Sequence, residues 1–389
     1  LQSLAYYGAK VDTSINFNAQ PVIVNVDVNI GPIYPLASFR IIPSNEMSIE
    51  QPNPYPFDSI SLCDLGISLN EPALPKNIID AEHLLIKQME KDGYPLAKIV
   101  KREVIADEAT KTVSVILHVD SGFLAKFGDT TITGQKRVKD IFFCRKITWQ
   151  KGCIYQPEQV SRTLNALEAS GLFSTINIRY ENDVDENGML PMIISVAEAK
   201  HRSIGFGLNY DTDLGPGLSA EWENRNLWGR GEKLSFVSNI WVKKKEGTLR
   251  YIKPDFCRPR QDLIWTAEVM NLETRGFEES SISLSGIIER QWNDNIRYSY
   301  GGMFKRLRNW DSDNNGSFNL VKAPLQFMWH KTNSLLDPTT GSVSLIKVTP
   351  TLQTMSPQFA YSINTIASSI YLPLRNDHRF VFAGKATFG

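Results

Sequence analysis

The chain has 389 residues, of which 42% are hydrophobic and 22% charged, a composition that excludes a disordered protein and allows several cores. Its 42 Lys and Arg residues balance 42 Asp and Glu residues, so no broad positive field favours nucleic acid, and we expect no nucleic-acid partner. The four cysteines and five histidines show neither CxxC nor HExxH spacing, so we expect no metal, no cofactor and no catalytic residues.

No apolar run approaches the roughly 20 residues of a membrane-spanning helix. The stretch 21–30 is interrupted by Asn25, Asp27 and Asn29. If the chain enters a membrane, we therefore expect it to do so as strands. Because the first residue is Leu1 and no export signal follows, we also expect the N-terminus to be cut.

A helix that ends at glycine and leads into an extended pair recurs three times, about 80 residues apart, at 4–8, 89–94 and 167–173. Residues 1–31 supply only the closing strand pair of the first copy. The second copy predicts a strand, a helix and two strands, at 39–42, 77–91, 97–105 and 112–119. This period is too long for a solenoid.

The third copy predicts the order strand, helix, helix, strand, strand, at 127–132, 138–144, 157–171, 175–180 and 192–196. Pro157 opens its long helix, Gly171 provides the left-handed stop, and Asn187-Gly188 predicts the hairpin turn. An unspecified small α+β repeat also fits this order.

This order and the GY and GLF helix ends resemble POTRA domains, the periplasmic modules of outer-membrane assembly and secretion barrels. The resemblance implies the C-terminal part of a POTRA domain at 1–31, a POTRA domain at 32–123 and another, next to a barrel, at 124–201. Small sheets of this kind expose edge strands that an extended client segment can join.

From residue 202 onward, strict alternation replaces helical periodicity. Ile204, Phe206 and Leu208 share one face of a strand, while Gly205 and Gly207 share the other. We count eleven such strands between residues 203 and 388, and strands of about ten residues favour a membrane barrel over a soluble sandwich. The DSDNNG loop at 311–316 is interpreted as a solvated loop rather than a calcium site.

Two motifs carry a more specific resemblance. The stretch 205–236 resembles the opening hairpin of TamA-like barrels, with NLWGRG at 226–231, and NSLLDPTTG at 333–341 resembles the D-x-L-x-P-T-x-G stretch before a later strand. The chain is similar throughout to the BamA/TamA-type outer-membrane barrel assembly superfamily, also called bacterial surface antigens. The candidate motif and seam residues are Gly205, Gly207, Asn226, Gly229, Arg230, Gly231, Asp337, Pro338 and Gly341.

The resemblance implies α+β POTRA repeats (β-α-α-β-β) followed, at 202–389, by the N-terminal part of an antiparallel transmembrane β-barrel, about 11 of 16 strands. The VRGY loop and the closing strands would follow residue 389. The implied activity is non-enzymatic: POTRA domains in the periplasm receive unfolded outer-membrane or autotransporter clients, and a barrel seam in the outer-membrane bilayer assists their insertion. A TamB-like inner-membrane partner is also implied.

Two other functions remain open. A two-partner secretion transporter shares POTRA repeats and a barrel, and so does the barrel domain of a patatin-like lipase fusion. Separately, Cys144 and Cys153 are close enough in sequence to be candidates for a disulfide in an oxidising periplasm.

Overall fold

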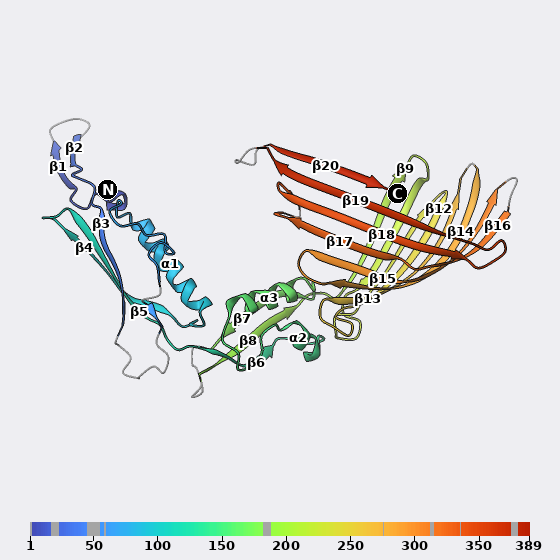
Figure 1. Ribbon diagram of the computed structural model, residues 1–389, viewed down its shortest axis with the longest axis horizontal. Helices are drawn as coiled ribbons and strands as arrows, with labels where there is room; N and C mark the ends of the chain where they lie inside the picture. Colours follow the sequence, from blue (N-terminus) through green and yellow to red (C-terminus); the bar gives the residue numbers. More distant parts are fainter. Residues whose placement is uncertain are drawn as a thin grey trace. The chain divides into compact units, whose positions relative to one another are not determined.

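The computed structural model describes residues 2–16, 23–44, 55–57, 60–181, 188–274, 276–311, 315–334, 336–374 and 380–389 (Figure 1). The chain divides into two compact units. The first comprises Leu1–Thr133, Thr148–Asn165 and Asn177–Ser195, and the second comprises Gly134–Ile147, Ala166–Ile176 and Val196–Gly389. The third predicted copy thus contributes segments to both units.

The chain begins with a short 3-10 helix, η1 (Gln2–Leu4), and an antiparallel hairpin of β1 (Lys10–Asn16) and β2 (Ile23–Asn29). The next elements are β3 (Leu36–Pro43), α1 (Pro75–Lys91), β4 (Lys98–Asp107) and β5 (Thr112–Asp120). β5 is the central strand of a three-stranded sheet, parallel to β3 and antiparallel to β4. The predicted strand, helix, strand, strand order of this copy is confirmed.

Helix α1 forms because its apolar residues recur every three or four positions. Ile78, Ala81, Leu85 and Met89 are all buried, and Pro75 occupies the first turn, where its missing N–H costs nothing. Alternate residues of β5 supply the opposite side of this core: Val113, Val115, Leu117 and Val119.

The third copy contains β6 (Lys126–Thr133), α2 (Asp140–Lys146), α3 (Pro157–Glu168), β7 (Phe173–Tyr180) and β8 (Met189–Glu198). Its sheet has the order β6-β8-β7, with β6 parallel to β8. The predicted β-α-α-β-β order is therefore confirmed. Asn187 of the predicted Asn187-Gly188 turn lies outside the described residues.

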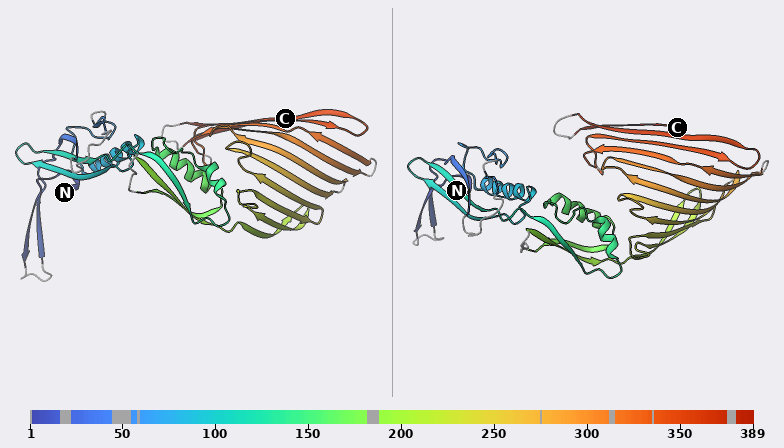
Figure 2. Two further views of the ribbon diagram at one scale, coloured as in Figure 1. Left: turned by 90° about the horizontal axis from the view of Figure 1, so that it is seen from below. Right: turned by 60° about the horizontal axis from the view of Figure 1, so that its bottom comes forward.

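An antiparallel sheet of twelve strands dominates the second unit, and Figure 2 shows it curling across its width. The strands are β9 (Arg202–Asp211), β10 (Gly215–Asn224), β11 (Lys233–Trp241), β12 (Lys244–Lys253), β13 (Gln261–Glu273), β14 (Phe277–Gln291), β15 (Ile296–Asp311), β16 (Asn315–Lys322), β17 (Leu325–Thr332), β18 (Gly341–Gln353), β19 (Phe359–Pro373) and β20 (Val381–Phe388). Neighbours in sequence pair, except that β16 and β17 both lie between β15 and β18.

The sequence predicts one strand over 318–330, where the structure has two. Tyr300 pairs with Leu325 and Met303 with Lys322, so the register continues across the break. Pro324 lies in the break and has no N–H to donate to the ladder. The predicted count of eleven is corrected to twelve strands, because one strand position is interrupted.

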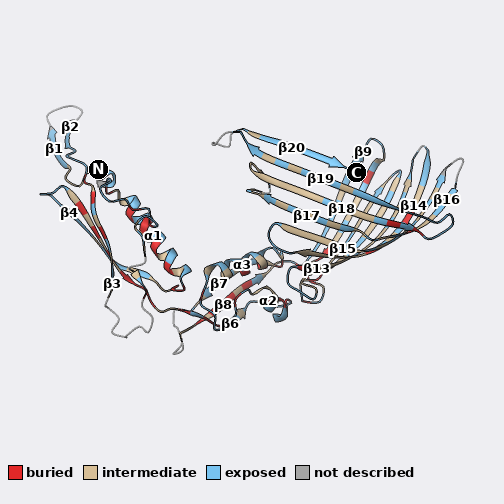
Figure 3. Ribbon diagram, viewed as in Figure 1, coloured by how far each residue is buried: buried red, intermediate tan, exposed pale blue. Residues whose placement is uncertain are grey.

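The twelve-stranded sheet has an apolar face and a polar face. On β14, Ile282 and Leu284 are exposed on one face, while Ser281 and Ser285 point to the other. Among the described residues after 201, Leu320 is the only buried apolar one, and Figure 3 shows correspondingly little buried surface along these strands. An exposed apolar face opposite a polar one is typical of strands that cross a bilayer around a polar interior.

None of the helices in the described part of the chain is both long and apolar enough to span a membrane.

Candidate functional site

Strand β9 is an edge of the twelve-stranded sheet. In the described chain it pairs only with β10, while β20 forms the other edge. Phe206 and Leu208 on β9 are 80% and 85% exposed, among the most exposed apolar side chains of the sheet. Within the described strands, this edge therefore combines an apolar face with backbone groups that only β10 pairs on one side.

The two candidate glycines of β9 lie on its polar face. Gly205 is opposite Glu221 and Gly207 is opposite Ser219. A Cβ at Gly205 would lie 3.9 Å from Cβ of Glu221, an ordinary contact. A Cβ at Gly207 would overlap the Ser219 hydroxyl oxygen, so the Ser219 side chain would have to rotate away. Packing therefore does not require glycine at position 205, and the proposed seam role of both residues stays a prediction.

The NLWGRG turn at 226–231 is closed by two side chains, that of Asn226 within the motif and that of Glu232 directly after it. The Asn226 carboxamide oxygen accepts the N–H of Gly231 at 3.0 Å, and the Glu232 carboxylate accepts the N–H of Arg230 at 3.0 Å. Asn226 is buried, as a residue that bonds the backbone from inside a turn should be.

The glycines of this turn lie against the segment 134–147. Lys139 donates its N–H to the carbonyl of Gly229 at 2.8 Å, and a Cβ at Gly229 would come within 2.8 Å of the Arg137 carbonyl oxygen. A Cβ at Gly231 would lie 2.8 Å from the Phe142 ring. Since both glycines also have positive φ, this motif serves the close approach of α2 to the sheet.

A second contact at this junction centres on Glu198, at the end of β8. Its carboxylate accepts the backbone N–H groups of Lys136, Arg137 and Val138 at 2.7, 2.8 and 2.9 Å. Nε2 of His201 lies 3.8 Å from the other carboxylate oxygen, and both side chains are almost fully buried. Burial alone would raise the pKa of Glu198, but the three N–H groups and His201 hold this pKa below its usual value.

Replacing Glu198 by Gln is expected to lower the free energy of unfolding by about 1–3 kcal/mol at neutral pH, because an ionised acceptor is removed. A carboxyl group whose pKa is lowered on folding stabilises the fold above its unfolded pKa of about 4.3 and stops doing so as pH falls through the folded pKa. Wild type and E198Q should therefore converge in denaturant unfolding below about pH 4. Glu168 is exposed and supplies the control, since E168Q should change the free energy of unfolding little at neutral or at acidic pH. A loss of stability in E198Q that is the same at every pH would contradict the proposed role of the Glu198 carboxylate.

Near the same junction, Lys146 of α2 forms an ion pair with Asp255 in the turn between β12 and β13, at 2.7 Å. Charged residues surround a cavity of about 520 Å³ beside this pair: Lys146, Arg225, Lys233, Arg260, Arg297, Asp255, Asp262 and Glu289. Sequence analysis missed Lys146, Asp255, Glu198 and His201, because nothing in the local sequence signals that partners far along the chain bury them.

The LDPTTG motif is a turn between β17 and β18. The Asn333 carboxamide oxygen accepts the N–H groups of Thr339 and Thr340 at 3.0 and 3.1 Å. Gly341 has a φ of +111°, and a Cβ there would overlap the Lys331 carbonyl oxygen. In this turn Asp337 is exposed and Pro338 is half-buried. The structure thus brings none of these residues to β9.

The candidate disulfide is not formed: Cys144 and Cys153 are both free, exposed thiols. Cys144 lies on α2, while the carbonyl of Cys153 accepts the N–H of Phe127 at the start of β6. Closeness in sequence therefore did not place the two sulfurs together. No group of three metal-binding side chains occurs in the part of the chain that the structure describes, and residues 312–314 of the DSDNNG loop lie outside it.

Comparison with known proteins agrees with this architecture. Residues 226–389 match the Omp85 superfamily domain, and residues 125–199 match the surface antigen variable number repeat, a POTRA domain. The chain is 22% identical over 246 residues to the outer membrane protein assembly factor BamA of Buchnera aphidicola, covering 62% of this chain and 38% of that protein. It is 21% identical over 164 residues to BamA of Neisseria meningitidis, covering 42% and 20%. It therefore spans about two fifths or less of these relatives.

Among solved structures, BamA from Haemophilus ducreyi lacking POTRA domains 1–3 superposes with a TM-score of 0.72 at 18% identity, over 91% of this chain and 70% of that one. The fold is that of a POTRA protein with part of an outer-membrane barrel. The chain belongs to the BamA/TamA-type Omp85 superfamily, and it is an outer-membrane protein whose POTRA domains lie in the periplasm. A closer relationship to the TamA-like branch stays a prediction.

Proposed function

We propose that this protein assists the assembly or translocation of outer-membrane proteins, with its POTRA domains receiving unfolded clients and its first barrel strand pairing with them. The observation that carries the proposal is the β9 edge, where exposed Phe206 and Leu208 accompany a backbone that pairs only with β10 among the described strands. Because an unpaired backbone group in hydrocarbon costs several kcal/mol, a client strand gains most by pairing there. No covalent chemistry is required.

The POTRA domain at 32–123 offers a second edge. β4 is ten residues long and pairs only with β5 among the described strands. Val104 and Ile105 on β4 are exposed, so an extended client can add backbone hydrogen bonds and apolar contacts together. This supports binding of clients through their backbone, which does not depend on the amino-acid sequence of the client. The domain boundaries at 31, 123 and 201 and a TamB-like partner remain parts of the proposal that await a test.

A photo-crosslinking residue at Phe206 tests the role of β9. In the full-length protein in membranes, a client stalled during assembly should crosslink at position 206. Phe304 is the matched control, because it lies on the same apolar face of β15 but in the middle of the sheet. Crosslinks at both positions would indicate contact through lipid exposure alone, and their absence at 206 would contradict pairing at β9.

A further inference from the structure

Two arginines of β15 lie on the apolar face of the sheet. Arg306 and Arg308 are exposed and alternate with exposed Phe304 and Trp310. Within the described residues neither arginine forms an ion pair or a side-chain hydrogen bond. An Arg facing lipid costs about 2–4 kcal/mol at the bilayer midplane and roughly 0–1 kcal/mol near an interface. These charges are therefore favoured only where the guanidinium group lies at an interface or extends to it along the barrel surface.

Strand register extends this polar feature into a row across five strands. Directly opposite residues share a face and have neighbouring side chains. The row on the apolar face consists of Lys245, Asn271, Ser280, Arg308 and Ser317, each opposite the next. Two rows closer to the start of β15, the same strands carry Leu249, Ala267, Leu284, Phe304 and Val321. The face thus changes from apolar to polar within a few residues.

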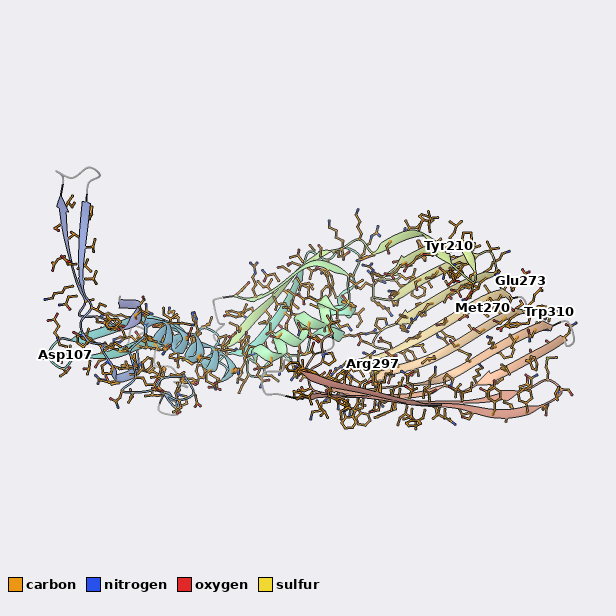
Figure 4. The ribbon with its side chains drawn as sticks, turned by 90° about the horizontal axis from the view of Figure 1, so that it is seen from above. Asp107, Tyr210, Met270, Glu273, Arg297 and Trp310 are labelled. Carbon is orange, nitrogen blue, oxygen red and sulfur yellow. The ribbon has the colours of Figure 1, made fainter. Side chains whose placement is uncertain are left out.

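The polar row lies at the outer end of the strands. β9 begins directly after the periplasmic POTRA domains, so its far end, near Tyr210, points outward, and Figure 4 shows Tyr210, Glu273 and Trp310 together at that end of the sheet. The stacked rings of Tyr298 and Tyr300, near the start of β15, are taken as the inner aromatic girdle of the band. Arg308 follows Tyr300 by eight residues, which is about 27 Å along a strand and about 20 Å after tilting. Since the apolar band is about 25 Å tall, Arg308 lies near its outer edge.

A surface depression of about 340 Å³ adjoins the row. Its lining includes Lys245, Asn271 and Ser280 of the row but also Glu273, Glu278 and Glu279, and neither arginine belongs to it. One row further out, Glu273 and Glu278 face each other directly. The carboxylates repel an anion, so an anionic ligand is kept out of the depression and is attracted to Arg308 instead.

We propose that this row binds the phosphate-bearing headgroup of a lipid. Arg308 is its main ligand, and Arg306, one row nearer the bilayer centre, reaches the same headgroup with its long side chain. Guanidinium groups bind phosphate oxygens in pairs and are weakly hydrated, which suits an interface. The apolar row around Phe304 and Leu284 lies directly below and accommodates acyl chains. That continuity between an anion-binding row and an apolar surface indicates a lipid rather than free phosphate.

Native mass spectrometry of the full-length protein in non-ionic detergent, titrated with phosphatidylglycerol, tests this proposal. We expect R306Q/R308Q to bind the lipid about tenfold more weakly than wild type. K322Q/K347Q is the matched control, because it also removes two positive charges but from the polar face, where Lys322 lies opposite Met303 and Lys347 opposite Gln326. This control should bind like wild type.

Equal binding by R306Q/R308Q and wild type would overturn the proposal, and so would an equal loss in the control. Inorganic phosphate at millimolar concentration should not displace the lipid; effective displacement would assign the row to free phosphate instead. Heat-modifiable gel migration checks that both variants fold. If R306Q/R308Q does not fold, the single variant R308Q replaces it and is expected to show an intermediate loss of lipid binding.

Discussion

Replacing Gly341 by Ala is expected to abolish most correct folding of the barrel. The φ of +111° at Gly341 lies outside the region that an L-residue adopts, and strain of this kind costs on the order of 1–3 kcal/mol. In addition, the new Cβ would overlap the Lys331 carbonyl oxygen, which can be relieved only by separating β17 from β18. A combined cost of about 3 kcal/mol or more is a large share of the usual 5–15 kcal/mol of folding stability.

The measurement is the fraction of refolded full-length protein that shows heat-modifiable migration in gels. Gly276, between β13 and β14, is the matched control, because a Cβ there meets no atom within 4 Å and its φ is not in the positive range. G276A should fold in wild-type yield. Equal yields for G341A and G276A would show that the turn can rearrange and that the motif is not a geometric requirement.

Replacing Asp255 by Asn is expected to destabilise the junction between α2 and the sheet by about 1–3 kcal/mol. The side chains of Lys146 and Asp255 are only 19% and 7% exposed, so removal of one charge leaves the other poorly solvated. Asn keeps the shape of Asp and tolerates the positive φ of position 255, so the loss reports the charge rather than the backbone. Hydrogen exchange of α2 in the full-length protein measures the opening of this junction.

The exposed pair of Lys151 and Asp129 provides the comparison, since its side chains are 57% and 81% exposed at the same 2.7 Å separation. D129N should change stability by at most about 1 kcal/mol, because water screens the charges. The double variant K146Q/D255N should recover part of the loss, because no unpaired charge remains. Similar effects of D255N and D129N would contradict a buried, junction-stabilising pair.

Elements with strong local periodicity were predicted well from sequence. α1 was expected at 77–91 and occupies Pro75–Lys91, and β5 was expected at 112–119 and occupies Thr112–Asp120. The spacing of their apolar residues already specifies which face is buried. The break at Pro324 was missed, although proline inside a central strand is itself a signal that the ladder is interrupted.

The candidate site was predicted less completely. Gly229, Gly231 and Gly341 were identified through motifs, and the structure supplies the reason: positive φ and close backbone neighbours. Glu198 and the pair of Lys146 and Asp255 carry no local signature, since their partners follow from packing. The proposed disulfide failed for the same reason, because proximity in sequence does not determine proximity in space.

By itself, the sequence determined the order of POTRA and barrel elements, the alternation of the strands and the turn motifs, because each of these depends on residues that are close together in the sequence. The tertiary structure alone decided which residues lie opposite one another. Register aligned Lys245 with Arg308 in one row and brought Lys146 to Asp255. The physical reason is that strand pairing and burial are long-range: they are set by the whole sheet, and a shift of one residue would exchange its two faces.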